Sequence, residues 1–111
     1  MPWLVRDGEV LASLEVVESW RDRRKGLLGR DGVEGALLLR PCRSVHTAGM
    51  HFDLDVAFCD DDLKVLETVR MRRWRLGRPR PAASCVLEAE AGAFERWRLR
   101  PGDQLEVKGS P

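Results

Sequence analysis

The sequence predicts an α+β protein dominated by an antiparallel, barrel-like β-sheet with two short helices. Short apolar runs recur along the chain, turn-forming residues separate them, and two stretches carry helical spacing. Closure into a barrel would also protect the edges of so many short strands. The chain has 111 residues, 43% of them hydrophobic, which is enough for a single core. We therefore expect one domain over residues 1–111, ending in a short tail at 108–111.

The first predicted elements are a hairpin, a helix and a buried strand. Asp7-Gly8 lies between two apolar stretches and suits a type I′ turn, because both central residues need positive φ. The second arm of this hairpin runs roughly from Val10 to Val17. A helix is expected from near Ser19 to near Gly29, where apolar residues recur at helical spacing. Residues 35–40, "GALLLR", end at a proline and predict a buried strand.

The second half of the chain predicts further short strands. One is expected near Leu54 to Cys59 and another near Leu63 to Val69, joined by an acidic turn at 60–62. The second of these alternates apolar and polar residues, the period of a half-solvated strand. Residues 71–83 have no period and contain two prolines and a glycine, which indicates a long exposed loop. Residues 84–107 are expected to form a strand, a single helical turn and, after a Pro-Gly-Asp turn, a final strand.

Composition narrows the classes of function. Nineteen Lys and Arg against eighteen Asp and Glu give a net charge of +1, and this balance argues against a dedicated nucleic-acid binder, which needs an excess of cations. No apolar run is long enough for a membrane helix and the N-terminal residues are charged, so we expect a cytoplasmic protein without a membrane partner. Cys42, Cys59 and Cys85 fit neither a disulfide framework nor a zinc knuckle, so we expect reduced thiols and no metal or other cofactor.

Several blocks resemble those of a known family. In order they are "RRKGLLGR" at 23–30, "LDVAF" at 54–58, "KVLETV" at 64–69 and "CVLEAEAGAFERWRLRPGD" at 85–103. Their order and spacing over about residues 10–107 are similar to the domain of unknown function 192 family of small bacterial and archaeal proteins. The resemblance implies a compact, mainly β fold and no particular reaction. This chain departs from the pattern at Leu28, usually methionine, at Asp53, usually proline, and at 46–50, commonly W-M-K-N-T. A ligand held by that lysine and asparagine could not be held here in the same way.

Two carboxylates are candidate binding residues. Asp55 falls at the Leu-Asp position of the family and begins an apolar strand, where an unpaired carboxylate would be costly. We expect Arg23, Arg30 or a cluster of backbone N–H groups to pair with it, and a structural ion pair or cap is favoured over a catalytic base. Glu88 follows two apolar residues and has the same two interpretations. If both carboxylates face one pocket, they could perform acid–base chemistry.

The two histidines, His46 and His51, do not predict a metal site. They are five residues apart, and neither a strand nor a helix aligns side chains at that spacing. A turn at Ala48-Gly49 could bring them together, so that alternative stays open. We expect His46 to be a half-buried strand residue and His51 to be exposed. Cys42 with His46 is a lesser alternative, a Cys/His nucleophile pair.

A basic loop is the remaining candidate. Residues 70–80 hold six arginines and no acid, with Trp74 in the middle, where a base could stack. The candidate polyanion-binding residues are Arg72, Arg73, Trp74, Arg75 and Arg78. Against this interpretation, Glu67 and the acidic turn lie close in sequence and could neutralise the loop, and Trp74 could simply pin it to the sheet.

Three functional hypotheses follow. The favoured one is a non-enzymatic binding or accessory domain, with a pocket near His46, Asp55 and the helix around 23–30 that holds a small ligand or a protein partner. The first alternative is an enzyme, hydrolase-like or other, that uses Asp55, Glu88 or His46 as acid–base groups. The second is a polyanion or nucleic-acid binder that uses the loop at 70–80. The sequence leaves open the ligand and the oligomeric state.

Overall fold

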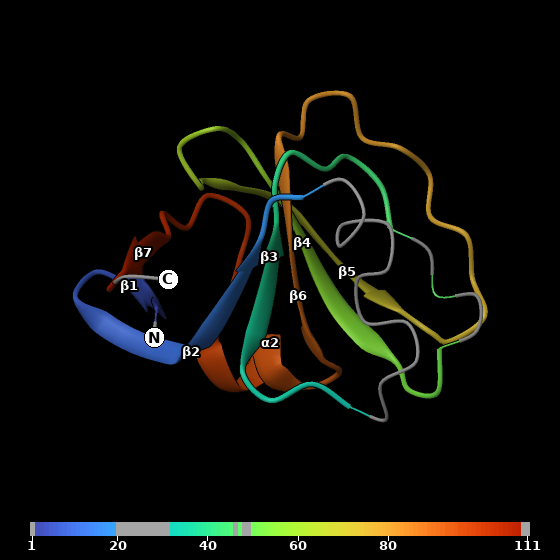
Figure 1. Ribbon diagram of the computed structural model, residues 1–111, viewed down its shortest axis with the longest axis horizontal. Helices are drawn as coiled ribbons and strands as arrows, with labels where there is room; N and C mark the ends of the chain where they lie inside the picture. The colour runs from blue at the N-terminus through green and yellow to red at the C-terminus, as the bar shows by residue number, and fades with distance from the viewer. Residues whose placement is uncertain (1, 20–31, 46, 48–49, 110–111) are drawn as a thin grey trace.

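A computed structural model describes residues 2–19, 32–45, 47 and 50–109. These residues form a seven-stranded sheet with the strand order β5-β4-β6-β3-β2-β1-β7, together with one short helix. The elements are β1 (Trp3–Arg6), β2 (Glu9–Val17), β3 (Ala36–Leu39), β4 (Leu54–Cys59), β5 (Val65–Met71), β6 (Cys85–Glu90), α2 (Ala93–Trp97) and β7 (Glu106–Lys108). In Figure 1 the sheet crosses the view from β7 and β1 at the left to β5 at the right, with α2 below the central strands.

The structure corrects two features of the predicted fold. The sheet has two ends, β5 and β7, so it is not a closed barrel. Among the described residues, its ends meet only locally, where Lys64 pairs with Gln104 ahead of β7. In addition, β2 and β3 run parallel, so the sheet is mixed. A parallel pair needs a long crossover, which residues 18–35 supply. The first predicted helix falls on this crossover, largely on residues 20–31, which lie outside the described residues.

The predicted hairpins are confirmed. Asp7 and Gly8 have φ values of 51° and 79°, as a type I′ turn requires, and β1 and β2 pair antiparallel on either side of them. β4 and β5 form the second hairpin. Its turn is closed by Asp60, whose Oδ1 accepts hydrogen bonds from the backbone N–H groups of Asp62 and Lys64, each at 2.9 Å. Leu63 takes a φ of 67° inside that turn, and this explains why β5 begins two residues later than predicted.

Both faces of the central strands are buried, because hydrophobic side chains pack against each of them. β3 and β4 are buried along their whole length, and β6 is buried up to its last residue. One face packs against α2 and includes Leu14, Leu38, Ala57, Leu87 and Phe94. The other includes Leu37, Leu39, Val56, Phe58 and Val86. A polar side chain on either face of these strands must therefore find a partner within the fold.

The three cysteines are free thiols, as predicted. Cys59 and Cys85 lie directly opposite one another on β4 and β6 and are buried in the core, whereas Cys42 is half-buried. The hydrogen bond with the Cys85 side chain, together with burial, raises the pKa of Cys59 well above its usual range. The Cys59 thiol is therefore protonated at neutral pH and behaves as a small core residue.

Candidate functional site

A groove of about 460 Å³ lies between the end of β5 and the loop that follows it. Its lining residues are Val69, Arg70, Met71, Arg72, Arg75, Leu76, Gly77, Arg78 and Arg80. Five of these nine residues are arginines and none of the nine is acidic. Charges of one sign that line a concave surface reinforce one another and concentrate counter-ions there. The groove is therefore the strongest local accumulation of positive charge among the described cavities.

Thr47 fixes the first part of the loop. Its side chain is fully buried, and its hydroxyl donates to the carbonyl of Arg72 at 2.5 Å and accepts from the N–H of Arg75 at 2.7 Å. Its backbone N–H donates to the carbonyl of Arg75 at 2.7 Å, and its carbonyl accepts from the N–H of Trp74 at 2.8 Å. These four hydrogen bonds from one residue hold residues 72–75 in place. The predicted loop is irregular, but this part of its backbone is tied to the fold.

Gly77 fixes the middle of the loop through a close backbone contact. Its N–H donates to the carbonyl of Val45 at 2.9 Å. A Cβ atom at this position would come within 2.3 Å of the same carbonyl oxygen, a distance that real Cβ atoms do not adopt. Only glycine therefore allows this part of the loop to lie against residue 45. Further along, the N–H of Arg80 donates to the carbonyl of Arg43 at 2.9 Å.

Two arginines of the groove are already paired within the fold. The Nε of Arg70 lies 3.1 Å from Oδ1 of Asp55, and the Nε of Arg80 lies 2.9 Å from Oε2 of Glu67. The guanidinium of Arg80 also stacks 4.5 Å from the centre of the Phe58 ring. Its hydrogen bond and charge hold the pKa of Glu67 below the ordinary value. These two arginines shape the wall of the groove.

The other groove arginines keep their charge available. Arg72, Arg75 and Arg78 are exposed, and within the part of the chain that the structure describes none of them forms an ion pair. Within the described residues, no carboxylate of the acidic turn at 60–62 forms an ion pair with them. Glu67 does lie near the loop; its hydrogen bonds go to Arg80, although the charge of Arg78 also helps to lower the pKa of Glu67.

The loop also presents apolar surface. Trp74 is 65% exposed and Leu76 is 84% exposed, so Trp74 does not pin the loop to the sheet. Trp74 has a φ of 63°, which is uncommon for a bulky residue, and the bond to Thr47 holds its backbone there. Arg73, the fifth candidate of the loop, is exposed; its N–H donates to Oδ1 of Asp53 at 2.9 Å. The structure thus brings together, on one loop, the basic and aromatic residues that the sequence singled out.

Asp55 is a structural residue. Its Oδ2 accepts hydrogen bonds from the backbone N–H groups of Gly92, at 2.9 Å, and Phe94, at 3.1 Å, at the start of α2. Its Oδ1 is paired with Arg70, which stands opposite it on β5. The prediction of an ion pair or cap is confirmed, with backbone N–H groups and a cross-strand arginine as the observed partners. Both oxygens are engaged, so Asp55 offers little to a ligand.

The condition for a carboxylate pair, that Asp55 and Glu88 face one pocket, is not met. Glu88 is buried on β6 opposite Val56, whereas Asp55 lies opposite Ala89. Because successive side chains on a strand point to opposite faces, the two carboxylates project from opposite sides of the sheet. Glu88 shares its face with Leu37 and Val56, and Asp55 shares the face that carries α2. They cannot act together on one substrate.

The remaining candidates do not form a described site. Arg23, Arg30 and His46 lie outside the described residues, so the pocket predicted around them is not described either. His51 is exposed, as expected. Within residues 2–19, 32–45, 47 and 50–109, no three His, Cys, Asp or Glu side chains are placed to hold a metal ion together. No helix in these same ranges has the length and apolar character needed to cross a membrane.

Sequence reasoning missed two residues that build the groove. Nothing in the sequence around Thr47 marks it as a residue that would fix the loop, because it lies in no motif and in no periodic pattern. Gly77 was visible only as a glycine in a loop, and its contact with Val45 lies 32 positions away along the chain. Neither contact follows from local periodicity, because both join two irregular segments.

The fold and the order of its motifs define the class of protein, a small, mainly β protein built on a mixed seven-stranded sheet. The model of the domain of unknown function 192 family, described as "Uncharacterized ACR", matches residues 3–107. The chain therefore belongs to this family, as its sequence blocks indicated.

Curated relatives of the chain are archaeal proteins of the UPF0127 group. The protein from Pyrococcus abyssi is 24% identical over 98 residues, which cover 84% of each chain. A relative from Thermococcus kodakarensis is 26% identical over 98 residues, 83% of this chain and 62% of the relative. A third, from Thermococcus gammatolerans, is 28% identical over 98 residues, 83% of this chain and 64% of the relative. The chain thus spans less than two thirds of these last two proteins.

Two solved structures share the fold. A protein of unknown function from Novosphingobium aromaticivorans has a TM-score of 0.79 and 20% identity, covering 95% of this chain and 82% of the other. A protein from Sinorhizobium meliloti, proposed to regulate transcription, has a TM-score of 0.80 and 20% identity, covering 96% of this chain and 91% of the other. At this identity the likeness establishes the fold alone.

Proposed function

We propose that this protein is a non-enzymatic binding protein that holds single-stranded nucleic acid in the arginine-lined groove. The observation that carries the proposal is the set of exposed, unpaired guanidinium groups of Arg72, Arg75 and Arg78 around a groove without acidic lining residues. Guanidinium groups match the geometry of phosphate oxygens and bind them through two parallel hydrogen bonds. The groove supplies the electrostatic part of the binding energy.

Trp74 supports a nucleic-acid ligand over a simple polyanion. Exposing the apolar surface of an indole to water is unfavourable, and stacking on a partner removes that surface from water. A nucleic-acid base offers a flat surface of matching size. Stacking of one base on an aromatic side chain contributes roughly 1–3 kcal/mol. Bases within a duplex already stack on one another, so an indole on a loop reaches them only in a single strand. Trp74 and Leu76 together provide the apolar surface that a phosphate backbone alone would not require.

The proposal departs from the expectation drawn from net charge. A charge of +1 over the whole chain excludes a protein that is basic throughout, but it does not describe one surface. Elsewhere, Arg6 and Arg40 form ion pairs with Asp103 and Glu18, so charge is balanced locally there. The favoured alternative from the sequence, a pocket that uses Asp55, loses support because both oxygens of Asp55 are engaged within the fold.

The test measures binding of a fluorescent oligothymidine of about 12 nucleotides by anisotropy over a series of salt concentrations. The variant Arg72→Gln/Arg75→Gln is compared with Arg98→Gln/Arg100→Gln, which removes the same charge from an exposed surface away from the groove. Each lost phosphate contact reduces the slope of log K against log salt by about 0.7, so the groove variant should lose about 1.4. Equal losses in both variants, or no binding at low salt, would overturn the proposal.

A second variant separates nucleic acid from other anions. Trp74→Leu should weaken oligothymidine roughly tenfold, whereas Trp3→Leu, which changes another partly exposed tryptophan, should leave the affinity unchanged. Inorganic polyphosphate should bind both variants equally. If Trp74→Leu binds oligothymidine as the wild type does, or if poly-glutamate competes as well as the oligonucleotide, the ligand is not nucleic acid and the proposal fails.

A further inference from the structure

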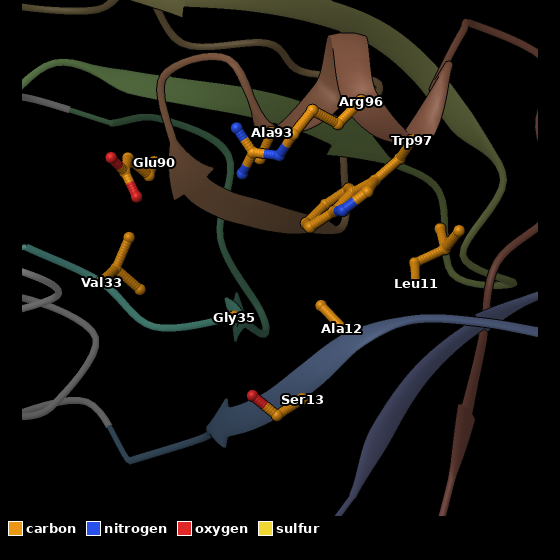
Figure 2. Close-up of a pocket in the computed structure, with 9 residues that line it drawn as sticks. All are labelled: Leu11, Ala12, Ser13, Val33, Gly35, Glu90, Ala93, Arg96 and Trp97. Carbon is orange, nitrogen blue, oxygen red and sulfur yellow. The ribbon is translucent and has the colours of Figure 1, made fainter.

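A second cavity, of about 290 Å³, lies on another part of the molecule and shares no residue with the groove. Its walls come from β2, from the segment before β3, from the end of β6 and from α2. The lining residues are Leu11, Ala12, Ser13, Val33, Gly35, Glu90, Ala93, Arg96 and Trp97, and Figure 2 shows them arranged around the space. Segments far apart in the sequence therefore converge on one cavity.

The cavity carries one charge of each sign. Glu90 ends β6 and Arg96 lies in α2, and in Figure 2 both side chains border the same space. In the described part of the chain, neither side chain forms an ion pair or a hydrogen bond. An arginine and a carboxylate that line one cavity without joining each other leave room for a ligand that bridges them.

The rest of the wall is made of uncharged residues. The Trp97 indole borders the cavity on one side, and its ring is packed against Phe94 with centroids 5.6 Å apart. Leu11, Ala12 and Val33 contribute aliphatic surface, and Ser13 contributes a hydroxyl. The opposite wall is brought close by Gly35, where a Cβ atom would lie 2.3 Å from Oγ of Ser13. Glycine at this position is therefore required for the cavity wall as well as for the start of β3.

We propose that this cavity binds a small zwitterion of the α-amino-acid type with an apolar side chain. Arg96 would hold the carboxylate, Glu90 would hold the ammonium, and the side chain would lie against Trp97 and Leu11. The volume suits a ligand smaller than a drug-sized molecule, because pockets for drug-sized ligands measure about 300–1,000 Å³ and this cavity falls just below that range. A ligand with a single charge would leave one of the two side chains without a partner.

The proposal can be tested on the full chain by NMR, with ¹⁵N-labelled protein titrated with leucine. The controls are N-acetyl-leucine, which lacks the ammonium, and leucinamide, which lacks the carboxylate. We expect millimolar binding of leucine, with shifts of the α2 amides, and roughly tenfold weaker binding of each control. Absence of shifts with leucine, or equal binding of all three compounds, would overturn the proposal.

Variants then assign each charge. Glu90→Gln should abolish the preference for leucine over N-acetyl-leucine, and Arg96→Gln should abolish the preference for leucine over leucinamide. Arg98→Gln, an exposed arginine next to the C-terminal end of α2, is the matched control and should change neither preference. If Glu90→Gln and Arg96→Gln keep both preferences while their spectra show an intact fold, the two charges do not recognise the ligand and the proposal is wrong. Because this cavity shares no residue with the groove, failure of the amino-acid proposal would leave the nucleic-acid proposal untouched.

Discussion

Removal of the Asp55 carboxylate should destabilise the protein, because this side chain holds the start of α2 and pairs with Arg70. Asp55→Ala leaves the N–H groups of Gly92 and Phe94 without an acceptor and Arg70 without its partner. The alternative Asp55→Asn keeps one oxygen that can accept from the helix start, but its amide group meets the guanidinium as a second donor. The two variants therefore separate capping from charge.

The magnitude can be worked from these contacts. Loss of a capping side chain costs about 0.5–2 kcal/mol, and a buried hydrogen bond to a charged group contributes about 1.5–3 kcal/mol. The ion pair adds at most about 1 kcal/mol, because the Arg70 side chain is 54% exposed. We expect Asp55→Ala to lower the free energy of unfolding by about 3 kcal/mol and Asp55→Asn by about 1–2 kcal/mol. Arg70→Met should cost less than about 1 kcal/mol.

Urea unfolding followed by tryptophan fluorescence measures these differences, with the slope of the transition as a check that all variants unfold in the same way. The informative result is the order of the losses in unfolding free energy, which should be largest for Asp55→Ala, smaller for Asp55→Asn and smallest for Arg70→Met. If Asp55→Ala unfolds within about 0.5 kcal/mol of the wild type, the two helix N–H groups find other acceptors and the capping role is wrong. If Arg70→Met costs as much as Asp55→Ala, the stabilisation resides in the ion pair.

Two further predictions concern titration and reactivity. In the native protein a thiol reagent should modify Cys42 at most, because Cys59 and Cys85 are buried. All three cysteines should react in denaturant. Rapid reaction of a second thiol in the native protein would contradict the packing. The hydrogen bond from Arg80 lowers the pKa of Glu67, so this pair stabilises the fold above the ordinary glutamate pKa of about 4.3, and the stabilisation is lost as the pH falls through the lowered value. NMR titration should show the Glu67 pKa rising in Arg80→Gln, and an unchanged pKa would rule out this pair as the cause.

Much of the fold could be predicted from local patterns. The Asp7-Gly8 turn, the buried run at 36–39 and the strand at 54–59 each follow from a few adjacent residues, and the structure contains all three. The open, mixed sheet could not be predicted in this way. The parallel direction of β2 and β3 depends on where the crossover at 18–35 returns the chain, which no residue type encodes alone.

The candidate sites show the same division. The basic loop and Trp74 could be recognised from sequence, because exposure and charge are properties of one segment. The relation between Asp55 and Glu88 could not, because it depends on the register between two strands, and a shift of one residue would reverse it. The register between β4 and β5 places Arg70 opposite Asp55, where the sequence had suggested arginines of the first helix.

The position of β6 sets an order on the assembly of the molecule. β1 with β2, and β4 with β5, are hairpins whose partners lie close along the chain. They belong to opposite halves of the sheet, however, and β6 is the strand that hydrogen-bonds to both β4 and β3. During synthesis the apolar faces of the earlier strands are therefore expected to stay uncovered until residues 85–90 have been made and can pair with them. We therefore expect a chain cut before β6 to lack a stable fold and to be a substrate for chaperones and proteases.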